Sequence, residues 1–268
     1  MANDKERIDI LLVENGLVET REKAKKIIMA GLVFIDSERI DKPGVKVPVE
    51  SNIIVKGNPI PYVSRGGLKL EKALKTFPVL LEDKVALDIG ASTGGFSDCM
   101  LKNGIRKVYA IDVGYGQLAW KIRSNKKVIA MDRTNIRYVT KKDIGELANF
   151  VSIDVSFISL KLVLPVVKEL TTDSVDIIAL IKPQFEAGRE KVGKKGVIKD
   201  INIHREVIKN IYNFCRTIDL DFVGLTYSPV KGAEGNREYL AHIVKNSDKV
   251  IDIDQLIETT VVESHNEL

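Results

Sequence analysis

Short apolar runs alternate with helical segments from Lys84 to the end of the chain, and this alternation is the clearest pattern in the sequence. Apolar runs bounded by turn residues are typical of strands that are buried on both faces of a sheet. Strands that alternate with helices imply a largely parallel sheet with helices on both faces. The pattern predicts seven strands, at residues 85–88, 108–112, 128–132, 150–154, 176–182, 222–226 and 239–244.

The N-terminal residues follow a different pattern, in which two amphipathic helices precede short strands. The helices are predicted within residues 6–34, with Thr20 as the N-cap of the second helix and Gly31 as its stop signal. Strands are expected at 32–36, 45–47 and 52–56. The predicted apolar faces of the two helices contain Ile8, Leu11, Leu12, Leu17, Ala24, Ile27, Ile28 and Met29.

The segment Asn58–Pro61 is the predicted linker between two domains. It contains two prolines, which favour extended backbone and disfavour helix in the residues before them. The predicted domains are therefore a small α+β domain at residues 1–60 and an α/β domain at residues 61–268. A chain of 268 residues is long enough for both.

The composition is that of a soluble globular protein, with 44% apolar and 29% charged residues. No apolar run reaches the roughly 18 residues of a membrane span, and the N-terminus has no signal-peptide core. Two cysteines in different predicted helices argue against a disulfide framework and fit a cytoplasmic setting. The three histidines lack ligand spacing with cysteines or acids, so no metal site is expected. No feature of the sequence specifies an oligomeric state.

The formal net charge of +4 is unevenly distributed along the chain. Residues 246–268 carry a net charge of −5, so the preceding 245 residues carry +9. Basic clusters recur at residues 21–26, 121–127 and 191–199. Any one cluster could be a solvated helix face, but their repetition favours a partner with a phosphate backbone, that is, a nucleic acid.

Residues 85–100 combine a predicted strand, a glycine-rich turn and the start of a helix. Gly90, Gly94 and Gly95 would let a ligand approach backbone N–H groups at the helix N-terminus. The spacing is not the G-x-G-x-x-G of dinucleotide-binding folds, because Asp88 stands two residues before the first glycine and the glycine pair comes late. This arrangement resembles the first motif of S-adenosylmethionine (SAM)-dependent methyltransferases. A tight strand–helix turn of any α/β protein is the alternative.

Ionisable residues stand at the predicted ends of five successive strands. They are Asp88, Asp112, Asp132, Asp154 and Lys182. Open α/β sheets bind their ligands at the carboxyl ends of the strands. A single acid at a strand end could be a helix cap, but five such residues predict an assembled site.

The whole chain resembles the TlyA family, whose members join an αL RNA-binding domain to an FtsJ-like ribose 2′-O-methyltransferase. The resemblance rests on the segments S64-R-G-G-L-K-L, L87-D-I-G-A-S-T-G-G-F-S-D-C, I111-D-V-G-Y-G-Q-L, D154-V-S-F-I-S-L, I181-K-P-Q-F-E and G235-N-R-E-Y. It implies a Rossmann-like SAM-dependent methyltransferase fold with a seven-stranded, mostly parallel sheet, preceded by a small αL domain. It also implies that the substrate is ribosomal RNA within ribosomal subunits, with cytidine riboses as the targets.

FtsJ-like enzymes use a Lys-Asp-Lys-Glu catalytic set, which the matching motifs place at Lys69, Asp154, Lys182 and Glu238. A ribose hydroxyl is a poor nucleophile, so the enzyme must align it with the methyl–sulfur axis and assist its deprotonation. Lys182 would serve either as an ammonium that stabilises alkoxide charge or as a base with a depressed pKa. Asp154 and Glu238 would orient Lys182, while Lys69 would hold the substrate or share the electrostatic work. Two surface salt bridges are the structural alternative.

SAM is the cofactor that the resemblance implies. Asp112 is expected to accept hydrogen bonds from its ribose, Asp132 to contact its adenine amine, and Tyr115 and Gln117 to wall the pocket. The glycine-rich loop is expected to lie near the methionine moiety. The candidate cofactor-binding residues are Asp88, Gly90, Ala91, Ser92, Thr93, Gly94, Gly95, Phe96, Asp112, Tyr115 and Asp132.

In αL domains the second helix presents a basic face to RNA. The candidate RNA-binding residues are Arg7, Arg21, Lys25 and Lys26 in the first domain and Arg65 in the second. Residues 1–60 contain ten basic and ten acidic residues, so the clustering of charge supports this interpretation and the net charge does not. A purely structural cap is the alternative.

Other functions predict features that this sequence lacks. Amino methylation of bases commonly uses an N/D-P-P-Y/F segment after the fourth strand, where this chain has D154-V-S-F157. Methylation at pyrimidine carbon 5 needs a nucleophilic cysteine, whereas Cys99 and Cys215 lie on predicted helices. A non-catalytic RNA-binding assembly factor would not need the catalytic set, and a haemolysin would need a membrane-active segment. Ribose methylation is therefore the leading hypothesis.

Overall fold

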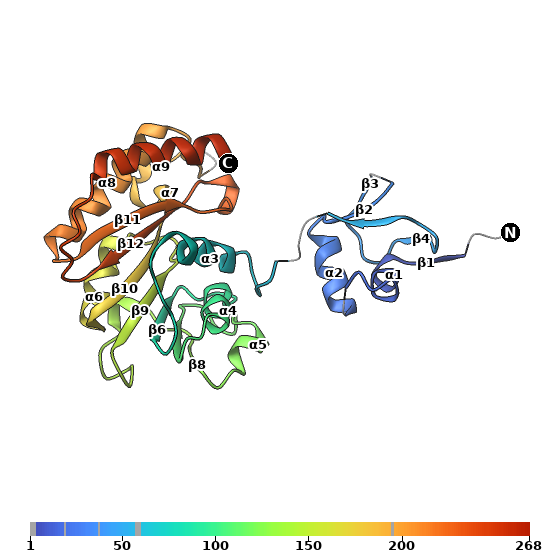
Figure 1. Ribbon diagram of the computed structural model, residues 1–268, viewed down its shortest axis with the longest axis horizontal. Helices are drawn as coiled ribbons and strands as arrows, with labels where there is room; N and C mark the ends of the chain where they lie inside the picture. Colours follow the sequence, from blue (N-terminus) through green and yellow to red (C-terminus); the bar gives the residue numbers. More distant parts are fainter. Residues whose placement is uncertain (1–3, 19, 37, 57–59, 194–195) are drawn as a thin grey trace. The chain divides into compact units, whose positions relative to one another are not determined.

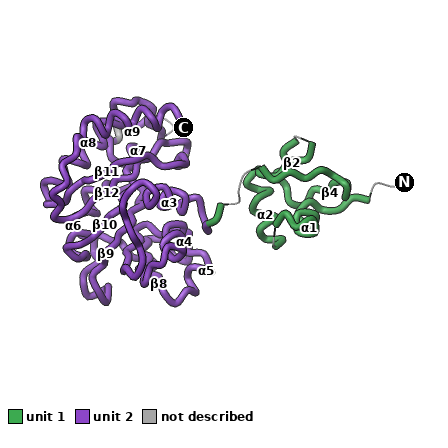
Figure 2. The backbone as a smooth tube through the Cα atoms, in the orientation of Figure 1, with its two compact units in different colours: residues 1–61 green, residues 62–268 purple. Residues whose placement is uncertain are grey.

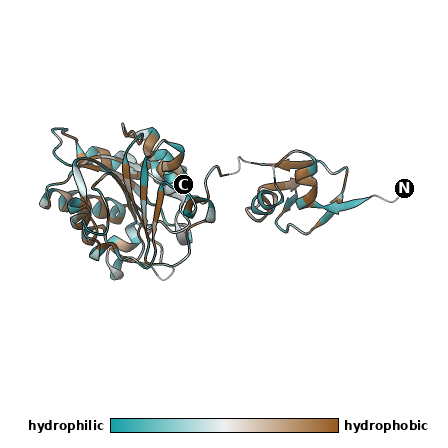
Figure 3. Cartoon of the chain, turned by 90° about the horizontal axis from the view of Figure 1, so that it is seen from below, coloured by the Kyte–Doolittle hydropathy of each residue, from teal (hydrophilic) through white to brown (hydrophobic). Residues whose placement is uncertain are grey.

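The computed structural model describes residues 4–18, 20–36, 38–56, 60–193 and 196–268. The chain forms two compact units, Met1–Pro61 and Tyr62–Leu268 (Figure 2). Each unit buries its own hydrophobic core, and apolar segments of both are brown in Figure 3. Asn58 and Pro59 of the predicted linker lie outside the described residues.

The N-terminal unit packs two helices against short antiparallel strands (Figure 1). The fully buried Ile8, Leu12 and Ile28 anchor its core, and burying such a side chain contributes about 1.5–3 kcal/mol. One small sheet pairs the first strand with the fourth, and the other has the order third, second, fifth. The elements are β1 Lys5–Arg7, α1 Ile8–Glu14, α2 Arg21–Met29, β2 Val33–Ile35, β3 Glu38–Ile40, β4 Lys46–Pro48 and β5 Ile53–Val55.

The structure confirms the cap and the stop of α2 but corrects details of the predicted helices. The Thr20 side chain accepts a hydrogen bond from the Lys23 amide at 3.2 Å, and Gly31 has a φ of +70°. Glu6 and Arg7 lie in β1, so the first helix begins at Ile8, two residues after the predicted start. Leu17 and Met29 are 43% and 64% exposed, because one follows the end of α1 and the other is the last residue of α2.

The larger unit is built on one seven-stranded sheet with the strand order β11-β12-β10-β9-β6-β7-β8. β10, β9, β6, β7 and β8 are mutually parallel, and β12 is antiparallel to both β10 and β11. This order confirms the predicted, mostly parallel sheet. The strands are β6 Val85–Ile89, β7 Lys107–Ile111, β8 Val128–Met131, β9 Ala148–Ile153, β10 Thr171–Ile181, β11 Asp221–Tyr227 and β12 Tyr239–Val244.

Helices cover both faces of this sheet (Figure 1). Alternate side chains of a strand point to opposite faces. Leu87 therefore belongs to the core that includes residues of α6, α8 and α9, and Ala86 to the core that includes residues of α3, α4 and α5. The α-helices are α3 Gly66–Thr76, α4 Gly95–Lys102, α5 Trp120–Arg123, α6 Leu164–Glu169, α7 Pro183–Glu186, α8 Ile201–Thr217 and α9 Ile253–Glu267. Short 3₁₀ helices lie at Ile136–Tyr138, Leu160–Leu162, Arg189–Lys191 and Ala233–Gly235.

Candidate active site

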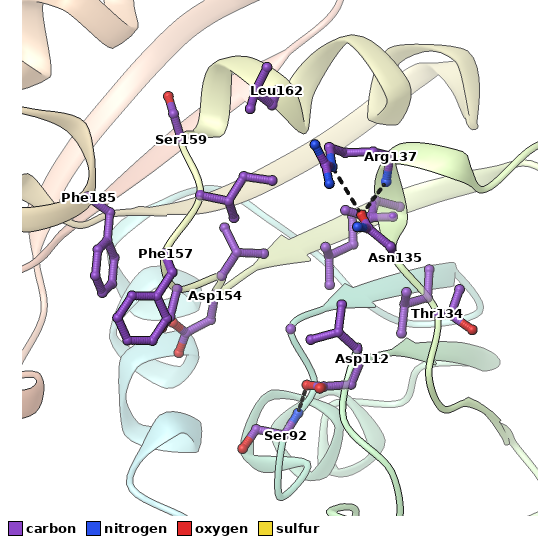
Figure 4. Close-up of a pocket in the computed structure, with 18 of the residues that line it drawn as sticks. Ser92, Asp112, Thr134, Asn135, Arg137, Asp154, Phe157, Ser159, Leu162 and Phe185 are labelled. Atoms are coloured by element: carbon purple, nitrogen blue, oxygen red, sulfur yellow. Dashed lines mark hydrogen bonds between the residues drawn. The ribbon is translucent and has the colours of Figure 1, made fainter. Parts of the chain in front are cut away.

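A cavity of about 780 Å³ lies at the carboxyl ends of the central parallel strands (Figure 4). Gly90, Asp112 and Asp154, which follow β6, β7 and β9, contribute to its lining. Further lining comes from the segments 134–137 and 155–159, together with Leu162 and Phe185. Parallel strands gather the residues that follow them at one edge of the sheet, where the sequence predicted a ligand crevice.

A second cavity of about 520 Å³ adjoins the first. It is lined by Arg65, which precedes α3, by Lys69 on α3 and by Lys231 from the loop before β12. Both cavities are lined by Gly90, Ser92 and Asp154, so they meet at the glycine-rich loop. The site therefore has two chambers that share one wall, as a reaction between two bound molecules requires.

The glycine-rich loop is shaped by contacts that only glycine allows. Gly90 has a φ of +81°, and a Cβ there would lie 2.3 Å from the carbonyl oxygen of Asp154. At Gly95 a Cβ would lie 2.2 Å from Oγ of Ser64. Gly94 is the N-cap residue directly before α4, and its backbone is left-handed with a φ of +91°. The loop therefore fits closely between the catalytic candidate Asp154 and the approach to α3.

The four predicted catalytic residues come from four different places in the chain and converge at the second cavity. Lys69 and Asp154 line it, whereas Lys182 and Glu238 are not among its described lining residues. Lys69 is on α3, Asp154 and Lys182 directly follow β9 and β10, and Glu238 directly precedes β12. Nζ of Lys182 is 2.6 Å from Oδ1 of Asp154, and Nζ of Lys69 is 3.4 Å from Oδ2. Nζ of Lys69 also lies 2.7 Å from Oε2 of Glu238. Lys69, Lys182 and Glu238 are all buried, so this group is not a pair of surface salt bridges.

The partners of Lys182 differ from those that the sequence suggested. Glu238 was expected to orient Lys182, but its carboxylate pairs with Lys69. The second polar contact of Lys182 is with Oγ of Ser156, at 3.0 Å. Asp154 is thus the centre of the group, because it contacts both ammonium groups.

The charges of this group stabilise one another. Burial would lower the pKa of Lys69, but the carboxylates of Asp154 and Glu238 outweigh it and raise the pKa above its ordinary value. Burial would raise the pKa of Asp154, but Lys69 and Lys182 together hold it below its ordinary value. Both groups are therefore ionised at neutral pH, and Lys69 is a fixed positive charge in the lining of the second cavity.

Some of the remaining cofactor candidates line a cavity and others do not. Asp112 lines the larger cavity, and its carboxylate accepts hydrogen bonds from the amides of Ser92 and Gly114, both at 2.7 Å. Asp132 and Tyr115 are not among the described residues that line either cavity. The carboxylate of Asp132 pairs with Arg123 at 2.5 Å, and the exposed Tyr115 ring stacks with an arginine. Further candidates that line one or both cavities are Gly90, Ala91, Ser92, Thr93, Gly95, Phe96 and Gln117.

Asp88 lies beneath the glycine-rich loop and connects the elements on either side of it through hydrogen bonds. It was predicted at a strand end, but it lies inside β6 and is only 1% exposed. Its carboxylate accepts hydrogen bonds from the hydroxyls of Ser97 on α4, at 2.6 Å, and Ser152 on β9, at 2.9 Å. Burial raises the pKa of Asp88 from 3.8 to about 6, although the two serine bonds oppose the shift.

This raised pKa predicts a pH-dependent effect of the substitution Asp88→Asn. Between about pH 4 and pH 6 the folded protein holds a proton on Asp88 that the unfolded chain releases, so this stabilisation is lost as pH rises through 6. Asparagine cannot ionise. The variant should therefore gain up to about 3 kcal/mol relative to the wild type between pH 4 and pH 7.5. Urea unfolding at both pH values measures this, and parallel pH profiles would contradict it.

Several lining residues were not predicted from sequence. Thr134, Asn135 and Arg137 follow β8, and the Asn135 side chain accepts a hydrogen bond from the Arg137 amide at 3.1 Å. Phe157 is 90% exposed with a φ of +63°, and its ring centroid is 4.9 Å from that of Phe185 (Figure 4). The two phenylalanines lie inside quoted motif segments, and all of these residues follow strand ends, which are the sequence signals that could have identified them.

The RNA-binding candidates are found in both units. Arg7 and Arg21 of the N-terminal unit share the carboxylate of Asp9. Lys25 and Lys26 lie further along α2 at partly or fully exposed positions. Arg65 stands before α3 in the other unit, lines the second cavity and donates a hydrogen bond from Nη2 to the carbonyl of Lys231 at 3.0 Å.

Within the residues that the structure describes, no helix is both long and apolar enough to span a membrane. Nor do they contain a group of three or more His, Cys, Asp or Glu side chains that could hold a metal ion. Cys99 and Cys215 are buried free cysteines.

The strand order and the glycine-rich loop after β6 are those of a Rossmann-like methyltransferase. The FtsJ-like methyltransferase family model matches residues 62–245, and the S4 domain model matches residues 6–53. The chain belongs to the TlyA family, which combines these two domains.

Similar proteins include named methyltransferases and proteins with a hemolysin name. YqxC of Bacillus subtilis, provisionally named an rRNA methyltransferase, is 54% identical over 91% of this chain and 87% of its own length. The 16S/23S rRNA (cytidine-2′-O)-methyltransferase TlyA of Mycobacterium tuberculosis is 37% identical over 91% of this chain and 92% of its own. A solved Streptococcus thermophilus protein with a hemolysin name has a TM-score of 0.78, with 46% identity over 99% of this chain and 98% of that one.

Proposed function

We propose that this protein is a SAM-dependent methyltransferase that modifies the ribose 2′-oxygen of ribosomal RNA, with cytidine as the expected nucleotide. The observation that carries the proposal is the buried group of Lys69, Asp154, Lys182 and Glu238 beside two joined cavities. The relatives named as rRNA (cytidine-2′-O)-methyltransferases support the choice of substrate. A ribosomal substrate would also place the reaction in the cytoplasm.

The larger cavity has the features that SAM needs. Asp112 offers a carboxylate at the position where Rossmann-like folds hold a ribose, and Ile111, Val113 and Ile136 offer apolar walls for an adenine. The loop at Gly90 lets the backbone approach a ligand closely. SAM, when bound, supplies a methyl group that its sulfonium already activates. The residues of this chain must therefore position and deprotonate the attacking hydroxyl.

We assign the action on that hydroxyl to Lys182, which contacts Asp154 at the wall shared by the two cavities. The Lys182 ammonium would stabilise negative charge that develops on the ribose oxygen, or its neutral form would accept the proton. Asp154 holds Lys182 at 2.6 Å and fixes its direction. Lys69, held by Glu238, adds a fixed positive charge on the other side of Asp154. Arg65 and Lys231 line the same chamber, where they would contact RNA phosphates.

The test uses ribosomal subunits and protein-free rRNA from a strain that lacks this activity. Each is incubated with the enzyme and methyl-labelled SAM, and the RNA is then cleaved by alkali. We expect label at one nucleotide together with resistance to cleavage at that position, because 2′-O-methylation removes the hydroxyl that attacks the backbone. SAM binding without label in any RNA would instead support a non-catalytic assembly factor. Label in an alkali-sensitive nucleotide would indicate base methylation.

A further inference from the structure

The two residues that flank Glu238 in the sequence are both bonded to one residue of α9. Nε of Arg237 donates a hydrogen bond to the carbonyl oxygen of Ser264 at 3.0 Å. On the other side of Glu238, the hydroxyl oxygen of Tyr239 lies 3.1 Å from Oγ of Ser264. Ser264 is fully buried in the last turn of α9, which comprises residues 264–267. The chain on both sides of Glu238 is therefore tied to a single point of this helix.

The carboxylate of Glu238 has little room to adjust its position. Its Oε2 is 2.7 Å from Nζ of Lys69, and the side chain is only 3% exposed. The other oxygen, Oε1, packs against Gly232, where an added Cβ would lie 2.1 Å from it. The strength of an ion pair depends on the distance between its charges. A shift of the backbone at Glu238 would therefore change the position of the Lys69 ammonium, which lines the second cavity.

The last turn of α9 is also connected to the helix that carries Lys69. The hydroxyl of Tyr227, at the end of β11, donates a hydrogen bond to the carboxylate of Glu267. The ammonium of Lys72 on α3 lies 3.2 Å from the centroid of the Tyr227 ring, which is a cation–π contact. Lys72 is three residues after Lys69, so the two side chains are neighbours on the surface of α3. Both partners of the Lys69–Glu238 ion pair are thus connected to the last turn of α9.

A simpler role for Arg237 is to cap α9. Its Nη2 also donates to the carbonyl oxygen of His265, at 3.4 Å, and a cation at the C-terminus of a helix interacts favourably with the helix dipole. A cap does not account for the contact between Tyr239 and Ser264, nor for the position of the arginine directly before Glu238. These two observations favour a role in the active site.

We propose that the last turn of α9 is a positioning element of the active site and that Arg237 is a positioning residue, which fixes Glu238 and through it the ammonium of Lys69. The inference rests on the proposed function, in which Lys69 supplies a fixed positive charge for methyl transfer. Neither Arg237 nor Glu238 is among the described residues that line the two cavities. Loss of the positioning should therefore slow the chemical step and leave the binding of SAM and RNA almost unchanged.

The substitution Arg237→Met removes the hydrogen bonds to α9 and keeps an unbranched side chain. We expect kcat at saturating rRNA to fall about tenfold, with the KM for rRNA and the affinity for SAM within about twofold of the wild type. Arg237→Lys keeps the charge and an N–H donor, so it should regain part of the lost activity. Arg205→Met is the matched control, because it removes an arginine contact with Glu258 of the same helix, at 2.7 Å, and should leave kcat unchanged.

The same substitution in a Glu238→Gln background separates positioning from general stability. If Arg237 acts through Glu238, Arg237→Met should lower the rate by less than about twofold in this background, because the ion pair that it positions is already lost. Single-turnover methylation measures the rate in both backgrounds. Equal fold losses would show that Arg237 only stabilises α9.

Circular dichroism reports whether each variant is folded. If Arg237→Met does not fold, Ser264→Ala takes its place, because it removes the hydroxyl beside Tyr239 and keeps the backbone carbonyl. Its loss of kcat should be severalfold and again confined to chains that keep Glu238. A wild-type kcat in the folded variant, or equal losses in both backgrounds, would overturn the positioning role, while methylation by the wild type would still support the proposed function. No methylation by the wild type would overturn the proposed function itself.

Discussion

Replacing Lys182 with alanine is expected to lower the rate of methyl transfer by about 10³-fold and to leave SAM affinity within a few fold. Lys182 lies beside Asp154 and Ser156, and it is not among the described residues that line the larger cavity proposed for SAM. The fold should survive, because Asp154 keeps Lys69 as a charged partner. Single-turnover methylation of the rRNA substrate and calorimetric SAM binding measure the two effects separately. Loss of both together would indicate misfolding and leave the assigned role unsupported.

The variant Lys182→Arg decides between the two possible roles of the lysine. Arginine keeps a positive charge but cannot release its proton in a protein, so it can stabilise an oxyanion and cannot act as a base. If Lys182 acts as an electrostatic stabiliser, the arginine variant should retain part of the activity that alanine loses. If Lys182 is the base, both variants should be equally inactive across the pH range.

Much of the larger unit could be predicted because its signals are local. Buried parallel strands appear as apolar runs, and each predicted strand lies within two residues of an observed strand at its carboxyl end. Parallel strands also explain why Asp112, Asp154 and Lys182 meet at one edge of the sheet. The strands of the N-terminal unit were harder to predict. Three-residue strands such as β1 and β3 are too short to show the two-residue alternation of apolar and polar positions.

The partners within the site could not be predicted, because they depend on side-chain direction. The motifs identified Glu238 but not whether it would face Lys69 or Lys182, which are both lysines at the same edge. Asp88 and Asp132 share the position of Asp112 in the sequence pattern. Only the structure shows that Asp88 is hydrogen-bonded to serines of α4 and β9 and that Asp132 forms an ion pair with Arg123.

Replacing Asp154 with asparagine should have a different outcome from replacing Lys182, because it damages both activity and stability. Asp154 neutralises two buried ammonium groups. In its absence Lys69 keeps the carboxylate of Glu238, whereas Lys182 keeps the hydroxyl of Ser156 and the distant ring of Phe185 but no carboxylate among the described residues. An uncompensated buried charge costs about 3 kcal/mol or more. We therefore expect methyl transfer to be lost and the larger unit to unfold at a clearly lower urea concentration, followed by circular dichroism and by the fluorescence of the single tryptophan, Trp120.

The double variant Asp154→Asn/Lys182→Met gives this explanation its decisive test. Methionine fills a similar volume without charge, so the double variant should regain most of the lost stability and none of the activity. The two changes in unfolding free energy are then not additive, which is expected if Asp154→Asn destabilises the protein through the charge left on Lys182. If the two destabilisations simply add, the ion pair at 2.6 Å does not govern the stability of the site. The double variant Asp154→Asn/Lys69→Met provides the comparison. Lys69 retains the carboxylate of Glu238 when Asp154 is replaced, so removing its charge should restore less of the lost stability.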